Sequence, residues 1–484
     1  MDAKTPLSIG LDRSRGMSLS AQIYGSIRDA IESGQLAAGA RLPSWSDLAA
    51  QLGVSRGTVR SAYERLTDEQ YVRGLGAAGT RVAERPAPTV ISRWSPEAPP
   101  LPRLFHEFGV APLAFQMGVP SQDAFPFKLW ARIQARSARR AAAAPVGYPD
   151  PRGDPDLRRE IAAYLGVARG LRCTPSQVFV TAGFSGALNL AIRGLRLEGG
   201  RAWMEDPGFP LTRTALELAG LDVMPVPVDA EGLDVGAGIR EAGRAGDARQ
   251  GEAWRAADVA VVTPGQQAPL GMTMSLARRM ALLDWARQSN AWIIEDDYLG
   301  ELQLKGRAAP ALASIDQAGR VMHIGSFSKT ISPALRLGFL VVPADLAHRF
   351  GDVAACLSPA PAASAQHAVT EFMHDGHYLR HLRRMKRLYA ARREALVRCL
   401  HELDSDAIRV LATAGTAVVA SLPESLSDVD IASRAQRLGL CPVPLSPWFM
   451  SAPRQQGLLL GVTNLNERTL RADCQRLLDL VRGE

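Results

Sequence analysis

The sequence predicts a small α+β winged helix-turn-helix domain followed by a large α/β domain, and three observations support this reading. Within the first 85 residues, helical patterns joined by a tight glycine turn precede a glycine-rich hairpin pattern. From about residue 113, short apolar runs alternate with helical patterns, which is typical of a mostly parallel sheet. A proline-rich stretch separates the two. We therefore expect a domain at 1–85, a semi-stiff linker at 86–112 and a domain at 113–484.

Composition narrows the class of protein. The chain has 484 residues, 46% of them hydrophobic, and a formal net charge of +7, which permits an anionic partner. Neither a membrane-spanning run nor a signal-peptide pattern is found. The five cysteines are scattered and include no CxxC pair, which argues against a disulfide framework and a metal site and favours the cytoplasm.

The N-terminal segment carries the helix signals in order. Ser44 is expected to cap one helix, Gly53 to provide the turn, and Ser55 to cap the next helix. The second helix buries Val59, Ala62, Tyr63 and Leu66, while its first turns face outward, where a helix-turn-helix contacts DNA. "YVRGLGAAGTRVA" reads as a two-stranded wing that offers Arg73 and Arg81 to phosphates. The predicted DNA-binding residues are Ser44, Arg56, Gly57, Thr58, Arg60 and Arg81.

A small helical domain with merely solvated arginines is the alternative to a DNA reader. The ordered set "LPS", "LGVSRGTV", "AYERL" and the glycine-rich wing is more specific than that, and it resembles the winged-helix domain of the GntR regulators over residues 17 to 83. Ser46 stands where that family commonly has an arginine that touches the DNA backbone, so we expect phosphate contact either to be weaker or to shift toward Arg41 and Arg56.

The large domain contains, in order, the groups that pyridoxal 5'-phosphate requires. Backbone N–H groups of Phe184 and Ser185 at a helix N-terminus suit its phosphate, and Phe209 could cover its ring. Asp296 ends an apolar strand and would keep the pyridine nitrogen protonated, while Tyr298 could donate to the phenolic oxygen.

Lys329 supplies the amine for a Schiff base with the cofactor, since desolvation would lower its pKa. Ser326 and Ser328 flank this lysine, and the planar fork of Arg336 would hold the phosphate. Each residue alone has an ordinary structural reading. The ordered set favours a cofactor site.

This half resembles the fold-type I aminotransferases of the aspartate aminotransferase group over about residues 113 to 484, through "GYPDPRGDPDLRREIAAYL", "MEDPGFP", "IIEDDY" and "GSFSKTISPALRLGFLV". With the winged helix, the chain resembles the MocR/GabR subfamily of bacterial transcription regulators. The resemblance implies a smaller C-terminal subdomain and a domain-swapped homodimer acting at a DNA operator in the nucleoid. It also implies that Tyr148 reaches the cofactor of the partner subunit.

Three positions depart from this pattern. Gln266 replaces the usual histidine of the "TPGQQAPLG" loop, and Ala268 stands where aminotransferases place an asparagine. Near Leu459, "GLLLGVTNL" lacks the arginine that grips an α-carboxylate. Either Gln267 or no residue replaces the asparagine. Either another arginine such as Arg213 replaces the missing one, or the effector is not an ordinary α-amino acid.

Three functions remain open. The first is a regulator in which an amine or amino-acid effector, or the cofactor level itself, alters operator binding. The second is a working aminotransferase with an accessory DNA-binding domain, against which the missing arginine argues. The third is a DNA-binding protein with an inactive scaffold, against which the retained Asp296, Tyr298, Lys329 and Arg336 argue.

Overall fold

A computed structural model describes residues 9–13, 16–76, 79–84, 112–143, 147–244, 257–304, 306, 308–403 and 408–483. The chain divides into two compact units, Met1–Pro102 (the N-terminal unit) and Arg103–Glu484 (the large unit). Of the predicted linker 86–112, residues 86–111 lie outside the described residues. Across the described part of the chain, no helix combines the length and the apolar character that crossing a bilayer requires.

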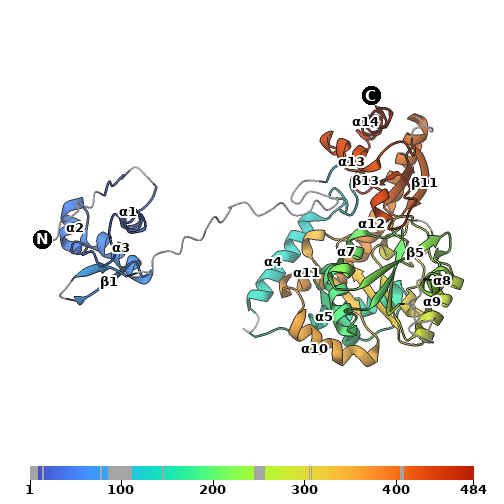
Figure 1. Cartoon of the computed structure of the whole chain (residues 1–484), viewed down its shortest axis with the longest axis horizontal. Coiled ribbons are helices and arrows are strands. Elements are labelled where there is room, and N and C mark those ends of the chain that lie inside the picture. The colour runs from blue at the N-terminus through green and yellow to red at the C-terminus, as the bar shows by residue number, and fades with distance from the viewer. Residues whose placement is uncertain are drawn as a thin grey trace. The chain divides into compact units, whose positions relative to one another are not determined.

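The N-terminal unit packs three helices against a hairpin (Figure 1). Its elements are α1 (Leu19–Glu32), α2 (Trp45–Leu52), α3 (Arg56–Asp68), β1 (Val72–Gly74) and β2 (Thr80–Val82). Gly53 ends α2 with φ 64°, a conformation that glycine adopts without steric cost. The predicted helix-turn-helix and antiparallel wing are therefore confirmed.

The core of this unit follows the predicted helical faces. Val59 and Leu66 of α3 are fully buried against Ile23 and Ile27 of α1 and Leu48 of α2. The apolar positions repeat every three to four residues along α1 and α3, so each helix presents one stripe to the others.

A mixed sheet forms the centre of the large unit. Its strands lie in the order β3-β10-β9-β8-β7-β4-β5-β6. Pairing is parallel from β9 through β8, β7 and β4 to β5, while β10 runs antiparallel to both neighbours and β6 to β5. The strands are β3 (Val178–Thr181), β4 (Arg201–Asp206), β5 (Asp222–Asp229), β6 (Gly232–Leu233), β7 (Val259–Val262), β8 (Trp292–Asp296), β9 (Val321–Ser326) and β10 (Gly338–Val341).

Helices cover both faces of this sheet, so the unit has three layers (Figure 1). Ala202 and Met204 of β4 join the apolar cluster under α6 and α10, whereas Trp203 between them stacks on Trp285 of α9 at 4.1 Å. The helices are α4 (Phe127–Ala143), α5 (Pro155–Ala168), α6 (Gly183–Leu195), α7 (Pro210–Leu218), α8 (Val235–Arg244), α9 (Leu276–Ser289), α10 (Ala347–Leu357) and α11 (Ala363–His374).

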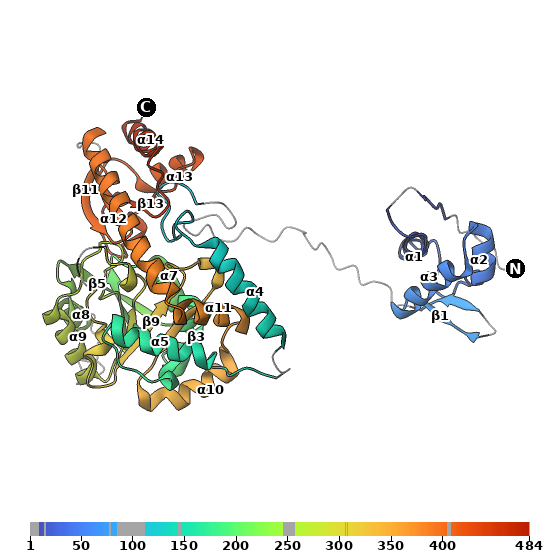
Figure 2. The same ribbon diagram turned by 180° about the vertical axis from the view of Figure 1, so that it is seen from behind.

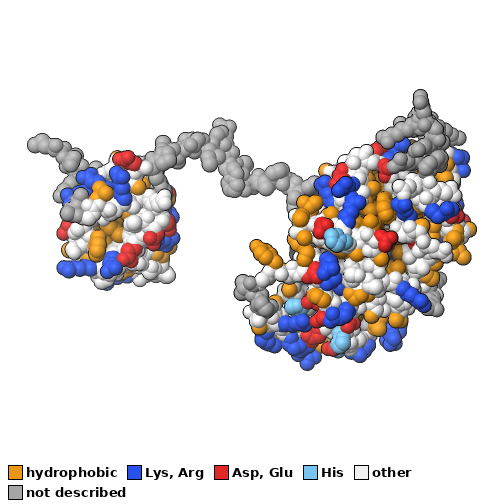
Figure 3. All heavy atoms as spheres, turned by 90° about the horizontal axis from the view of Figure 1, so that it is seen from below, with side chains coloured by type: hydrophobic (Ala, Val, Ile, Leu, Met, Phe, Trp, Pro, Cys, Tyr) orange, Lys and Arg blue, Asp and Glu red, His pale blue; other side chains and the backbone are white. Residues whose placement is uncertain are grey.

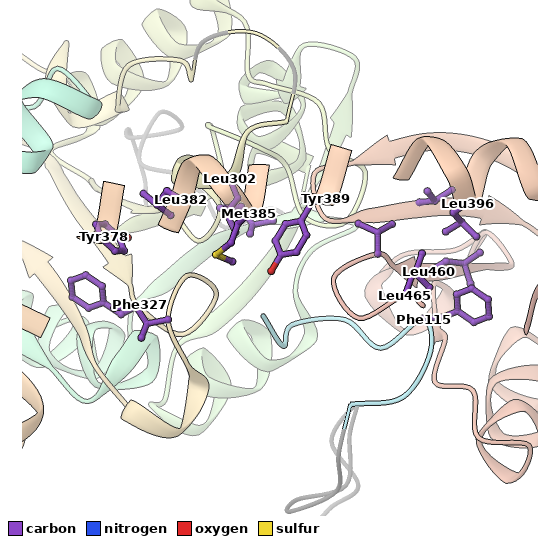
Figure 4. Close-up of a cluster of buried hydrophobic side chains, with 14 of the residues drawn as sticks. Phe115, Leu302, Phe327, Tyr378, Leu382, Met385, Tyr389, Leu396, Leu460 and Leu465 are labelled. Carbon is purple, nitrogen blue, oxygen red and sulfur yellow. The ribbon is translucent and has the colours of Figure 1, made fainter. Parts of the chain in front are cut away.

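A smaller C-terminal part carries an antiparallel sheet in the order β11-β12-β14-β13. Its elements are β11 (Arg409–Ala414), β12 (Ala417–Ser421), α13 (Asp428–Arg437), β13 (Val443–Pro444), β14 (Gly457–Gly461) and α14 (Leu470–Arg482). The long helix α12 (His377–Leu403) joins it to the central sheet (Figure 2). Tyr378 and Leu382 lie near Phe327 at one end of α12, and Leu396 lies near Leu460 at the other (Figure 4).

One expectation about the large unit was wrong for the residues that the structure describes. The Ala/Arg/Gly-rich stretch 236–256 reads from sequence as an insertion with little structure, yet residues up to Arg244 are helical in α8; the rest lies outside the described residues.

On the face of the large unit seen from below, basic, acidic and histidine side chains mix (Figure 3).

Candidate cofactor site and nucleic-acid interface

The predicted cofactor residues gather at one edge of the central sheet. Strands β3, β4, β7, β8 and β9 all end there, because parallel strands place their carboxyl ends at the same side. Asp296 ends β8 and Ser326 ends β9, while β10 starts at this edge just beyond Arg336. The fold thus brings together residues that lie up to about 150 positions apart.

The three consecutive acids after Ile294 have separate partners. Glu295 accepts hydrogen bonds from the Leu312 and Ala313 amides (2.7 and 3.0 Å) and pairs with His323. Asp297 accepts two bonds from Arg169 (2.7 and 2.9 Å), and both side chains are buried. Side chains alternate along a strand, so Asp296 between them points the other way.

Asp296 is a carboxyl without a donor: in the part of the chain that the structure describes, no side chain or amide donates a hydrogen bond to it. Burial, followed by the nearby Asp297 and Glu205 carboxylates, raises the pKa of Asp296 to about 8, and Lys329 opposes the shift. A half-buried acid of this kind favours its neutral form until a cation is placed against it.

Lys329 lies in the turn after β9, and its Nζ donates to the carbonyl oxygen of Gly118 at 3.1 Å. Burial lowers the pKa of its ammonium group, and Asp296 opposes this. Gly118 has φ 81°, and a Cβ there would lie 2.8 Å from Nζ. A side chain at residue 118 would therefore push the Lys329 Nζ away from this position.

Arg336 lies against the N-terminus of α6. Its Nη2 donates to the Ala182 carbonyl oxygen at 3.3 Å, and Ala182 caps α6 without a side-chain hydrogen bond. The first amides of the helix, those of Gly183, Phe184 and Ser185, have no acceptor within the helix. A guanidinium beside free helix amides attracts an anion.

Phe209 and Tyr298 line the same region. Both are half-buried and pack against one apolar cluster, and the Phe209 ring lies 5.4 Å from that of Trp448. Burial, with smaller contributions from Asp296 and Glu205, raises the pKa of Tyr298, so its hydroxyl remains a donor at neutral pH.

The three departures from the family pattern fall in this region too. Gln267 joins its own loop to the segment after β4, because its Nε2 donates to the Pro207 and Ala268 carbonyl oxygens (2.7 and 2.8 Å). Gln266 is buried, and its Oε1 finds no donor among the described residues. Leu459 is fully buried in the apolar cluster.

Other predicted residues lie at the rim or apart. Ser326 Oγ accepts from the Ser328 amide at 3.2 Å, which holds the turn that carries Lys329. The side chain of Tyr148 is fully exposed. Arg213 Nη2 points to the Pro447 carbonyl oxygen at 3.5 Å.

The predicted DNA-contacting residues lie on the first turns of α3 and beside them. Arg56 and Gly57 are exposed, and in the described structure no acceptor pairs with the Arg56 guanidinium. Arg60 pairs with Glu64 at 2.7 Å, and its guanidinium lies 5.8 Å from the ring centroid of the exposed Trp45.

Ser44 and Thr58 have structural partners as well. Ser44 Oγ accepts from the Asp47 amide at 3.2 Å, which confirms the predicted N-cap of α2. Ser55 Oγ accepts from the Thr58 amide at 3.1 Å and lies 2.8 Å from the Thr58 hydroxyl. These bonds fix where α2 and α3 begin.

In the wing, Arg81 is half-buried and donates to the Gly39 carbonyl oxygen at 2.8 Å. Arg73 is exposed and pairs with Glu84 at 3.5 Å. The exposed Arg41 crosses the wing tip, since a Cβ on Gly79 would lie 3.1 Å from its Nε.

A cavity of about 490 Å³ in the large unit is lined by residues of α4, α5 and α11 and by none of the candidate cofactor residues. Its charges are internally paired: Arg136 with Glu371, Arg140 with Asp156, and His374 with Glu160. Paired charges leave little affinity for a ligand, so we assign no role to this cavity.

Sequence reasoning missed Gly118 and Glu205. Nothing in the local pattern links Gly118 to a lysine 211 residues later. Glu205, in the noted motif "MEDPGFP", is buried and accepts bonds from the Thr263 hydroxyl and amide (2.5 and 3.2 Å). Burial raises its pKa to about 7, and the Thr263 bonds oppose the shift. An acid inside an apolar strand was the available signal.

Comparison with known proteins matches both units. Residues 19–82 match the family of bacterial regulatory proteins, gntR family, and residues 115–437 match aminotransferase class I and II. The probable rhizopine catabolism regulatory protein MocR of Rhizobium meliloti is 36% identical over 473 residues, covering 95% of this chain and 93% of its own.

Two further proteins extend the comparison. The pyridoxine biosynthesis transcriptional regulator PdxR of Corynebacterium glutamicum is 30% identical, and 98% of each chain is covered. The crystal structure of an archaeal alanine:glyoxylate aminotransferase is 24% identical with a TM-score of 0.69, covering 78% of this chain and 92% of that one. This last likeness concerns the fold alone. The chain belongs to the MocR family of transcriptional regulators, in which a GntR helix-turn-helix domain is fused to an aminotransferase class I/II domain.

Proposed function

We propose that this regulator holds pyridoxal 5'-phosphate covalently, as a Schiff base with Lys329, and that the site senses an amine or amino-acid effector or the cofactor level itself. The response is a change in operator binding by the winged helix. The observation that carries the proposal is the position of Lys329 and Asp296: the lysine follows β9, the acid ends the neighbouring strand β8, and burial disfavours the charged form of both.

The residues present fit the group. Asp296 lacks a donor, and a protonated ring nitrogen would supply one. Arg336 and the first amides of α6 form an anion site for the phosphate. Gly118 leaves the space that Lys329 needs. When bound, the cofactor supplies an aldehyde that reacts with primary amines and a ring that withdraws electrons.

The chain's own residues would set the response. Ser326 and Ser328 hold the turn of Lys329, and Phe209 and Tyr298 line the site and limit its water. Lys329 would hold the cofactor through its amine, and a primary-amine effector would compete in exchange with Lys329 for that place. That exchange regulates DNA binding only if the two forms of the chain bind DNA differently.

Further parts of the proposal follow the family. We place the DNA-binding domain at 1–85, the linker at 86–112 and the sensing domain at 113–484, with the protein in the cytoplasm on the nucleoid. The assembly is a domain-swapped homodimer, in which the exposed Tyr148 reaches the partner's cofactor.

The visible absorbance of the purified chain, recorded after addition of pyridoxal phosphate, tests the cofactor proposal. We expect a band that Lys329→Ala abolishes and that candidate amines shift. Absence of the band in the unaltered chain would contradict both the sensor and any enzyme based on this cofactor.

Two glycine variants distinguish an effect on the position of Lys329 from a general loss of stability. Gly118→Ala and Gly199→Ala place a Cβ at similar φ (81° and 77°), but only the first meets Lys329; nothing lies within 4 Å of the second. We expect loss of the band in the first variant alone, with a modest stability cost in both.

An aminotransferase with an accessory DNA-binding domain is the second candidate, favoured by the retained set of Asp296, Tyr298, Lys329 and Arg336. Keto-acid formation at about 1 per second or faster would support it. The buried Leu459 argues for slower turnover.

A further inference from the structure

Trp45 is an exposed aromatic residue that lies beside helix α3 of the N-terminal unit. It is the first residue of α2, and 48% of its surface is accessible, whereas Tyr24 and Tyr63 of the same unit are buried in the core. A single apolar side chain on a surface is ordinary, so its neighbours decide what it does. The neighbour of Trp45 on α3 is Arg60.

The Arg60 guanidinium is held from two sides. It lies 5.8 Å from the centroid of the Trp45 ring, within the range of a cation–π contact, and its Nε donates to Glu64 Oε1 at 2.7 Å. In the described part of the chain, its terminal nitrogens Nη1 and Nη2 donate to no acceptor. These contacts therefore orient the guanidinium and leave its two outer N–H groups open to solvent.

Arg65, five residues further along α3, has the same kinds of partner in a different setting. Its Nε donates to Glu69 at 3.0 Å, and its guanidinium lies 4.0 Å from the centroid of the Tyr24 ring. Tyr24 is buried, and its hydroxyl donates to the same Glu69. Five residues place Arg65 about 140° around the helix from Arg60. The Tyr24 contacts thus join α1 to α3, whereas the Trp45 contacts lie at the surface that α3 presents to DNA.

An arginine held in this way suits a guanine edge. The two outer N–H groups match the O6 and N7 acceptors that guanine presents in the major groove. A side chain that is oriented before binding loses less conformational entropy when the contact forms. DNA that covers the exposed Trp45 ring would also exclude water from the cation–π contact, which strengthens it.

From this geometry, and resting on the DNA binding of the proposed function, we infer that Trp45 and Glu64 are positioning residues that hold Arg60 for a guanine of the operator. Trp45 therefore sets the sequence specificity at the base pair that Arg60 contacts.

Duplexes with single base-pair changes test the inference on the full chain. The unaltered chain first selects duplexes from a random pool, and each base pair of the selected sequence is then replaced in turn. Arg60→Ala should lose discrimination at one guanine–cytosine pair of each half-site. Trp45→Ala should lose about tenfold discrimination at the same pair and none elsewhere. Trp45→Phe, which keeps an aromatic ring, should retain most of it. Low salt keeps weak complexes measurable.

Two further variants separate orientation from general effects. Arg65→Ala removes the matched arginine and should leave discrimination unchanged at every base pair. Glu64→Ala removes an acid, which raises affinity for all DNA, so a loss confined to the Arg60 pair identifies lost orientation.

Unchanged discrimination at the Arg60 pair in Trp45→Ala, or an equal loss at all base pairs, would overturn the inference. Arg60→Ala that keeps discrimination at every base pair would overturn it too. Selection that enriches no sequence would instead contradict the DNA binding of the proposed function.

Discussion

In the N-terminal unit Arg56 and Arg60 stand exposed on the first turns of one helix, whereas in the large unit Asp296 and Lys329 are half-buried, one ending β8 and the other following β9. Arg56 and Arg60 are four residues apart on α3 and face solvent. Lys329 touches Gly118 from 211 residues away, and Asp296 reaches the same site from another strand.

This difference indicates which interactions supply the binding free energy at each site. An exposed arginine meets DNA with its charge intact, and each contact adds a modest, salt-dependent increment. Burial of an acid or amine destabilises its charged form, because the group loses its contacts with water. The pKa shift measures this free-energy cost. A ligand group of opposite charge offsets this cost when it binds. Single substitutions in the large unit's site should therefore change ligand affinity more than single substitutions on α3 change DNA affinity.

Asp296→Asn should lower the affinity for pyridoxal phosphate more than any of the other substitutions changes affinity or stability. A small effect would contradict the stated difference between the two units. Without its acid, the site cannot form an ion pair with a protonated ring nitrogen, and a broken buried pair costs about 3 kcal/mol or more, roughly 100-fold in affinity. Titration with pyridoxal phosphate, followed in the visible spectrum, measures this. Asp284→Asn, at an exposed position of α9, is the control. Equal affinities in the two variants would place Asp296 outside the site.

Glu205→Gln tests burial through pH. The pKa of Glu205 rises in the folded chain to about 7 from its usual value near 4.5. The folded state therefore holds the proton more tightly, and stability contributed below pH 4.5 is lost as pH rises toward 7.

Relative to the Gln variant, the unaltered cofactor-free chain should lose on the order of 2 to 3 kcal/mol of unfolding free energy between pH 4.5 and 7.5. Denaturant unfolding at several pH values measures the difference, and Glu217→Gln, exposed on α7, is the control. A difference that stays constant with pH would mean that Glu205 titrates as an exposed acid.

The contrast also explains what could be predicted from sequence. Helix caps are local, so Ser44, Gly53 and Ser55 were placed correctly from spacing alone. The alternation of strands and helices likewise predicted the mostly parallel sheet. Side-chain alternation would have separated Asp296 from Glu295 and Asp297, although only the folded chain reveals Arg169 and His323 as the partners.

Non-local contacts could not be predicted in this way. The role of Gly118 depends on where the chain returns after the sheet is complete. The burial of Leu459 between Val419 and Val443 depends on pairings among β12, β13 and β14 that no local pattern specifies.

Arg56→Ala should weaken operator binding by about 1 to 3 kcal/mol and leave the cofactor band unchanged. If its contact is to phosphate, affinity should fall similarly for all sequences and the salt dependence should decrease by about one ion. Fluorescence anisotropy with duplexes selected by the unaltered chain measures both. Arg28→Ala, on α1 beside Asp29, is the control. Unaltered affinity in Arg56→Ala would show that α3 does not carry the main contacts.

Ser55→Ala should have the smallest effect, and it sharpens the comparison because the change is purely local. Loss of the bond from the Thr58 amide removes the N-cap of α3, which costs about 1 kcal/mol. Hydrogen exchange followed by mass spectrometry should become about five times faster in α3 and stay unchanged in the large unit. Ser55→Asp, which restores an acceptor at the cap, should recover slow exchange. Faster exchange around Lys329 would mean that the two units are energetically coupled, in which case an effect at one site could not be assigned to local contacts alone.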